Sequence, residues 1–184
     1  KVFLVDDNAT NLQGLYRTLD GCGYTLLIAK DGAAALNIAR KAIPSLILLD
    51  IMMPGMSGFE VCEQLKQDES TKDIPVIFLS AMDDSQSKVR GLALGGVDYI
   101  AKPFQSDEVV ARVRTHIKMH RLEAALAQKN ADLEDENQRI LDAVAEGIVS
   151  LDSRGRIRSV NPMACEIMGW SSSDVTGESI HQLQ

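Results

Sequence analysis

The sequence predicts an α/β fold for residues 1–104, built on a doubly wound sheet of five parallel strands. Short apolar runs alternate there with segments whose apolar residues recur at helical spacing. The runs are apolar almost throughout, which is typical of parallel strands that helices cover on both faces. The predicted strands are 1–5, 25–29, 46–49, 75–79 and 97–101, and the predicted helices are 11–20, 32–41, 59–66, 86–94 and a segment that begins near Ser106.

The composition fits one or two globular domains. Of the 184 residues, 45% are hydrophobic, which is enough for a packed core, and the net charge of −7 argues against a nucleic-acid surface in this segment. Cys22, Cys62 and Cys165 follow no zinc or CxxC spacing, so we expect reduced thiols in a cytoplasmic protein. No apolar run approaches the roughly 18–20 residues of a membrane span, and no membrane association is expected. The chain begins without Met inside a predicted strand, so we expect it to be a piece of a longer protein.

Polar residues follow the predicted strands at the point where each strand ends. They are Asp6 and Asp7, Asp50, Ser80, and Lys102. In parallel sheets the working site lies at the carboxyl ends of the strands, so three carboxylates, a hydroxyl and an ammonium are expected at one edge. Asp and Ser also favour ordinary turns, which is the alternative for any one of these residues. The coincidence of all five favours a functional site.

Three carboxylates at one edge predict a metal site, because a cation must offset their mutual repulsion. Hard oxygen ligands suit Mg²⁺, which binds through one or two carboxylates and keeps several waters. We expect Asp7 and Asp50 to bind the ion directly, and Asp6 to bind it directly or through water. The backbone carbonyl of Met52, two residues past Asp50, is a further expected ligand. A static Mg²⁺ or Ca²⁺ site is the alternative, but it leaves the hydroxyl and the ammonium unexplained.

The same edge is suited to phosphoryl transfer. A carboxylate can attack phosphorus and form an acyl phosphate, and Asp50 is the predicted nucleophile. Lys102 can pair with the phosphoryl group as a point charge on a flexible stem. Ser80 can donate a hydrogen bond to it.

A long helix is predicted after the sheet, because no Gly or Pro occurs between Phe104 and Gly147. The segment 106–108 can cap its start. The stretch after about Met119 is too heavily charged to be core. A solvated single helix is one interpretation, but a dimeric coiled coil is favoured because an isolated charged helix needs tertiary support.

Two coiled-coil registers are open. In the first, Leu126, Leu133 and Ile140 recur every seven residues at position d, and Asn130 and Asn137 stand at position a. Asn at a favours a two-stranded parallel coil. The second register reads Met119, Leu122, Leu126, Lys129, Leu133, Glu136, Ile140 and Ala143.

The last segment has the pattern of a small α+β unit. Residues 148–151 and 156–160 are predicted strands, and 152–155 between them is a predicted hairpin turn. Asn161-Pro162 opens a predicted short helix through Met168, and 171–174 is a further helix start.

Residues 1–104 closely resemble a bacterial two-component response regulator receiver domain. The matching pieces are Val5-Asp6-Asp7-Asn8, Leu49-Asp50-Ile51-Met52-Met53-Pro54-Gly55-Met56-Ser57-Gly58, Leu79-Ser80-Ala81 and Asp98-Tyr99-Ile100-Ala101-Lys102-Pro103-Phe104. The resemblance implies a flavodoxin-like fold, a cis bond at Lys102-Pro103, and phosphoryl transfer to Asp50 from a histidine kinase or phosphotransfer protein. It also implies a switch, in which Ser80 moves toward the phosphoryl group and Tyr99 turns into the space that Ser80 leaves. Plain core is the alternative for Tyr99.

The resemblance further implies a surface for dimerisation. Some receivers pair through the region that corresponds here to 86–94, 97–101 and the helix from Ser106. Lys88 with Glu108, and Asp98 with Arg112, stand where opposite charges would bridge two copies. Unrelated surface charges are the alternative, since exposed pairs contribute little energy.

Residues from about Arg139 resemble the entry to a PAS domain. The matching pieces are Ile140–Val149, Asp152–Gly155, Val160-Asn161-Pro162-Met163-Ala164 and Met168-Gly169-Trp170. Only the first part of such a domain is seen, so the resemblance does not imply a heme, flavin or small-ligand role, and ligand binding is left open. Cys165 and His181 are interpreted as structural or surface residues.

The sequence therefore predicts a receiver at 1–105, a helix and coiled coil at 106–146, and a partial PAS segment at 147–184. We expect a cytoplasmic homodimer that relays phosphorylation of Asp50 through a dimeric helix to the PAS segment and a further output domain. The alternative is the regulatory fragment of an output enzyme, either a hybrid histidine kinase or a cyclic-di-GMP diguanylate cyclase or phosphodiesterase. A stand-alone adaptor is a third interpretation. With no nucleotide-binding motif in the sequence, the expected chemistry is phosphoryl acceptance and self-dephosphorylation.

Overall fold

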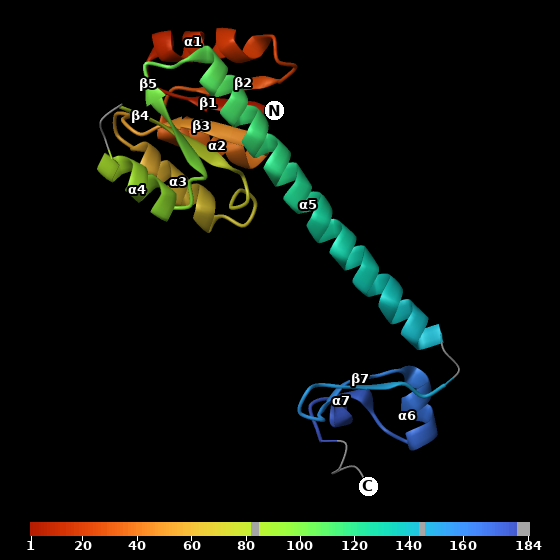
Figure 1. Cartoon of the computed structure of the whole chain (residues 1–184). Coiled ribbons are helices and arrows are strands. Elements are labelled where there is room, and N and C mark those ends of the chain that lie inside the picture. Colours follow the sequence, from red (N-terminus) through yellow and green to blue (C-terminus); the bar gives the residue numbers. More distant parts are fainter. Residues whose placement is uncertain (82–84, 144–145, 180–184) are drawn as a thin grey trace. The chain divides into compact units, whose positions relative to one another are not determined.

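The structure is a computed structural model that describes residues 1–81, 85–143 and 146–179, with side chains except those of residues 81 and 85–88. It divides into two compact units, Lys1–Glu123 and Ala124–Gln184. The helix α5 (Ser106–Ala143) belongs to both (Figure 1). No Gly or Pro interrupts it, and the uninterrupted helix predicted from Ser106 is confirmed over these residues.

The first unit is a five-stranded parallel sheet covered by helices on both faces, which confirms the predicted fold class. The strands are β1 (Val2–Val5), β2 (Leu26–Ala29), β3 (Leu46–Asp50), β4 (Val76–Ala81) and β5 (Asp98–Lys102). Their order in the sheet is β2-β1-β3-β4-β5, and every neighbouring pair is parallel. The reversal of order after β1 brings the ends of β1 and β3 side by side, and this is where α/β sheets place their sites.

The helices of the first unit form two layers around the sheet (Figure 1). They are α1 (Ala9–Asp20), α2 (Gly32–Ala42), α3 (Gly58–Gln67), α4 (Ser85–Ala93) and the first part of α5. Side chains of a strand alternate between faces, so Val2 and Leu4 pack with α1 and α5, whereas Phe3 and Val5 pack with α2 and α3. Helices cover both faces, which explains why β1 and β3 are apolar and buried until Asp50.

Side-chain caps set where the helices begin. The Asn8 side chain accepts hydrogen bonds from the backbone of Thr10 and Asn11, so α1 begins at Ala9, two residues earlier than predicted. Ser57 and Glu60 form a capping box that starts α3 immediately after the loop that follows β3. The loops beside the carboxyl ends of β1 and β3 are thereby held by their own side chains.

The second unit contains an antiparallel hairpin and two short helices, as predicted. Its elements are β6 (Val149–Leu151), β7 (Ile157–Val160), α6 (Pro162–Met168) and α7 (Ser172–Val175). The buried Asn161 side chain accepts from the backbone N–H groups of Ile148 and Ala164, and it donates to the carbonyls of Leu141 and Glu146. One amide thus joins the last turn of α5, the hairpin and α6.

The structure also bears on Cys165, on His181 and on the question of membrane spans. Cys165 lies half-buried in α6, and His181 lies outside the described residues. In the part of the chain that the structure describes, no helix combines the length and apolar character that crossing a membrane requires.

We predict that Gly58→Ala destabilises the protein by about 1–3 kcal/mol. A Cβ at Gly58 would lie 2.1 Å from the backbone oxygen of Asp50, so the loop after β3 would have to move. Urea unfolding followed by circular dichroism measures the free energy of unfolding.

Gly14→Ala in the middle of α1 is the matched control, because a Cβ there meets nothing within 4 Å. It should instead stabilise the protein by about 0.5–1 kcal/mol through helix propensity. Equal effects of the two substitutions would contradict the close approach at Gly58.

Candidate functional site

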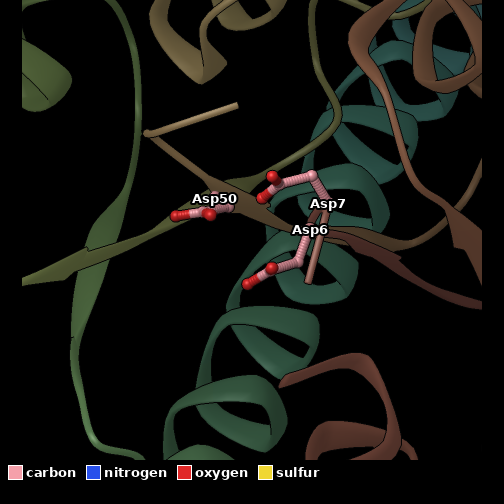
Figure 2. A group of neighbouring side chains, drawn as sticks. All are labelled: Asp6, Asp7 and Asp50. Carbon is pink, nitrogen blue, oxygen red and sulfur yellow. The ribbon is translucent and has the colours of Figure 1, made fainter. Parts of the chain in front are cut away.

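The acidic site lies at the carboxyl ends of β1 and β3. Asp6 and Asp7 directly follow β1, and Asp50 is the last residue of β3. Figure 2 shows the three carboxyl groups turned toward one space, and a ligand oxygen from each lies within 4.8 Å of the others. Asp6 and Asp50 are buried, whereas Asp7 is exposed. The site therefore has two carboxylates inside the fold and one side open to solvent.

Lys102, the last residue of β5, neutralises part of this negative charge. Its ammonium Nζ lies 2.8 Å from Oδ1 of Asp50 and 2.9 Å from Oδ2 of Asp6. The peptide bond between Lys102 and Pro103 is cis, as the receiver resemblance implies. Three carboxylates and one ammonium leave an excess of two negative charges when all are ionised. The group of side chains is thus suited to a divalent cation.

The surroundings shift the protonation of both Asp50 and Lys102. Burial is the main cause that raises the pKa of Asp50, and the negative charge of Asp6 raises it further. The hydrogen bond and charge of Lys102, and the backbone N–H of Met52 at 3.4 Å, offset part of this rise. Burial alone would lower the pKa of Lys102, but its hydrogen bonds to Asp50 and Asp6 outweigh burial and raise it. Lys102 is consequently held as the cation.

Two neighbours of Asp6 that the sequence reasoning missed hold its carboxylate in place. The backbone N–H of Asn8 donates to Oδ1 of Asp6 at 2.8 Å, and the amide of Asn11 donates to Oδ2 at 3.0 Å. An Asn in the first turn of a helix that follows an acidic pair is the signal that would have pointed to Asn11. These bonds fix the rotamer of Asp6 before any ligand binds.

Ser80 in β4 is buried beside the site and has an unused hydroxyl. In the described residues, its Oγ is the buried side-chain polar atom that has no hydrogen-bond partner. In the sheet register Asp50 is opposite Leu79 and Ser80 is opposite Ala101, so Ser80 stands between the strands that carry Asp50 and Lys102. Buried side-chain polar atoms without a partner are rare and cost stability.

The predicted dimer-face residues of β5 and α5 are paired within one chain. Nη1 of Arg112 lies 2.7 Å from Oδ2 of Asp98, and its Nε lies 2.9 Å from Oε1 of Glu108. His116, which the sequence reasoning missed, shares Oδ2 of Asp98 at 2.9 Å. Lys88 belongs to α4, but its side chain lies outside the described residues. Exchange of these pairs between two copies stays a prediction.

These charges surround the predicted switch residue. Burial would raise the pKa of Asp98, but hydrogen bonds from His116, the N–H of Tyr99 and Arg112 together lower it. The half-buried Tyr99 ring lies with its centroid 5.9 Å from the Arg112 guanidinium. Tyr99 is therefore in contact range of the charges that join β5 to α5.

Comparisons with known proteins agree with this geometry. The protein-family model of the response regulator receiver domain matches residues 2–114, and the family model of the PAS fold matches residues 135–184. A crystal structure of a putative response regulator from Chloroflexus aurantiacus superposes with a TM-score of 0.62 at 34% identity, over 64% of this chain and 96% of that chain.

Curated relatives extend beyond the chain. Response regulator PleD of Caulobacter vibrioides is 35% identical over 155 residues, which are 84% of this chain and 33% of that protein. The DNA-binding response regulator MtrA of Mycobacterium tuberculosis is 39% identical over 134 residues, which are 73% of this chain and 58% of that protein. The chain thus spans between a third and three fifths of the length of these relatives. Because the receiver model covers more than half of the chain, and the fold and acidic edge agree with it, the chain belongs to the response regulator receiver domain family.

Proposed function

We propose that Asp50 accepts a phosphoryl group from a phosphohistidine of a histidine kinase or phosphotransfer protein. The observation that carries the proposal is the position of Asp50, which is buried beside Asp6 and Asp7 and 2.8 Å from the Lys102 ammonium. A carboxylate oxygen of Asp50 attacks phosphorus, the P–N bond of the donor breaks, and its electron pair leaves with the imidazole. The product is an acyl phosphate on Asp50.

Lys102 compensates charge during this transfer. In the present structure its ammonium is shared between Asp50 and Asp6, and the flexible stem allows it to turn toward a phosphoryl oxygen. Its raised pKa keeps it cationic at neutral pH, so an anionic phosphoryl group meets a positive charge.

We propose Mg²⁺ as the cofactor, held by the carboxylates of Asp6, Asp7 and Asp50 and the backbone carbonyl of Met52. The donor set fits, because it consists of hard oxygens with two uncompensated negative charges and one solvent-exposed side for water ligands. When bound, the ion would neutralise the oxygens of the phosphoryl group in transit. With the ion bound, the remaining tasks of the protein would be to orient the phosphodonor and to keep Lys102 beside Asp50.

Ser80 and Tyr99 form the proposed switch. The orphaned hydroxyl of Ser80 would donate a hydrogen bond to the phosphoryl group, and Tyr99 would turn into the space that Ser80 leaves. Tyr99 contacts Arg112, so its movement would disturb the Asp98–Arg112 and Glu108–Arg112 pairs. Freed charges, together with Lys88, would then be available to a second receiver.

The proposed output is a cytoplasmic homodimer that carries the signal along α5 toward the PAS segment. Its surfaces are α4, β5 and α5 of the receiver and the distal coiled coil. The response regulator names of the relatives do not favour the alternative of a fragment from a hybrid kinase or a cyclic-di-GMP enzyme.

We predict that the chain gains the mass of one phosphoryl group when it is incubated with Mg²⁺ and acetyl phosphate. Asp50→Asn should abolish the gain, because its amide is not a nucleophile toward phosphorus. Asp20→Asn, a change to an exposed carboxyl at the end of α1, is the control and should label normally. Intact-mass spectrometry that found label on the Asp50 variant would refute the assignment.

Mg²⁺ alone should raise the melting temperature, because a ligand that binds only the folded state stabilises it. At a Mg²⁺ concentration of about 100 times the dissociation constant, the free energy of unfolding should rise by about 2.7 kcal/mol. Asp7→Asn should lose most of this gain, and Asp20→Asn should keep it. Calorimetry that shows equal gains in the two variants would exclude Asp7 as a ligand.

Ser80→Ala should stabilise the unphosphorylated protein by roughly 1 kcal/mol, because it removes a buried hydroxyl that has no partner. The same change should weaken the response to phosphorylation, visible as a smaller shift of the Tyr99 ring signals in NMR spectra with beryllofluoride. A destabilised variant with an unaltered Tyr99 response would contradict both roles.

A further inference from the structure

The distal part of α5 exposes a row of large apolar side chains. Every residue from Arg121 to Ile140 is exposed, and the buried residues of α5 all lie in its first turns. Leu126, Leu133 and Ile140 are 63%, 44% and 57% exposed. A polar helix without tertiary contacts is marginal in water, so this row needs a partner.

We propose that this segment pairs with the same segment of a second copy as a parallel, in-register, two-stranded coiled coil. Leu126, Leu133 and Ile140 occupy heptad position d, and Asn130 and Asn137 occupy position a. The inference rests on the homodimer of the proposed function and adds the register and direction of its helices. It selects between the two patterns that apolar periodicity alone leaves open.

Between Leu126 and Ile140, charge disfavours the second register. There Lys129 and Glu136 would stand at core positions, and in a symmetric dimer each would face its own copy. Lys129 against Lys129 and Glu136 against Glu136 are repulsive pairs in a partly desolvated layer. In the proposed register the same levels of the coil hold Asn130 against Asn130 and Asn137 against Asn137, whose amides can donate and accept.

The asparagines also decide the direction. In a parallel coil position a faces position a, so each asparagine meets its equivalent and forms a hydrogen bond. In an antiparallel coil position a faces position d, and the amides would be buried against leucine or isoleucine without partners. The parallel arrangement is therefore the one that satisfies Asn130 and Asn137.

The charges that flank the core complement each other between copies. Lys129 falls at position g and Glu134 at position e, and in parallel coils a g residue meets the e residue five positions further along the other helix. Neither side chain forms an ion pair with a described residue of its own chain. Two symmetric Lys129–Glu134 pairs would thus join the helices.

The polar pairs within α5 support the same register. In the distal part of α5 they are Gln128–Asp132, Asp135–Arg139 and Gln138–Asp142. All six residues fall at positions b, c and f, which face outward in the proposed register. In the second register Asp132 and Arg139 would instead flank the core at position g. The side chains that pair within one helix therefore face outward, whereas Lys129 and Glu134, which have no ion pair with a described residue of their own chain, flank the core of the coil.

The test exchanges the flanking charges in the full chain. Lys129→Glu and Glu134→Lys should each raise the dimer dissociation constant about tenfold in sedimentation at low salt, and the double variant should recover it. The two positions are five apart, so recovery cannot come from contact within one helix. Asp135→Arg and Arg139→Asp change outward charges and are the matched controls, with no expected effect. Circular dichroism checks that helicity is unchanged.

Each other outcome overturns a stated part. In the second register Glu134 points outward, so a dimer that is insensitive to Glu134→Lys, or a double variant that does not recover, refutes the proposed register. Oxidation should cross-link Asn130→Cys at position a but not Ala131→Cys at position b; a dimer without that difference refutes the parallel direction. A wild-type chain that is monomeric with and without beryllofluoride refutes the coil and the homodimer, while the mass test on Asp50 still decides phosphorylation.

Discussion

The bond between Lys102 and the two buried carboxylates of Asp6 and Asp50 is the constraint on which the rest of the site depends. Burying two carboxylates beside each other is unfavourable unless a cation is placed between them. Lys102 reaches them from β5 because the parallel strands β1, β3 and β5 all end on the same side of the sheet, and only β4 separates β3 from β5. The strand order that forms the two cores therefore also brings Lys102 to Asp6 and Asp50.

The same constraint leaves groups at the site that the proposed reaction would use. One ammonium cannot neutralise three carboxylates, so a bound cation would offset the remaining charge, and the exposed Asp7 leaves one side open to solvent. The hydroxyl of Ser80 has no partner in this state. In the proposed reaction the carboxylates would gain a partner when a cation binds, and the Ser80 hydroxyl would gain one when a phosphoryl group arrives. At this end of the sheet the fold therefore presents groups whose interactions phosphorylation would complete.

The sequence was sufficient for the fold and for most of the site. Apolar runs that end in Asp50, Ser80 and Lys102 predict both the buried strands and the edge where these residues meet, because strand direction places them there. The position of Asn11 in the first turn after the acidic pair carried a signal, but its hydrogen bond to Asp6 also depends on its rotamer. His116 could not be predicted, because its role depends on a contact between α5 and β5. Apolar periodicity alone leaves two coiled-coil registers open. The proposed register rests on the charges and asparagines of the same segment, and the polar pairs of α5 support it.

Helix α5 connects the proposed switch in the receiver to the proposed coiled coil. Its first turns are fixed to the receiver by the buried Val109, Val113 and Ile117 and by the pairing of Arg112 with Asp98. A helix without Gly or Pro transmits rotation, because each turn is hydrogen-bonded to the next. If Tyr99 loosens Arg112, the helix changes its angle at the receiver, and a coil locked by Asn130 and Asn137 resists slipping in register. Rotation of paired helices, rather than sliding, is then the motion that the chain can pass along α5.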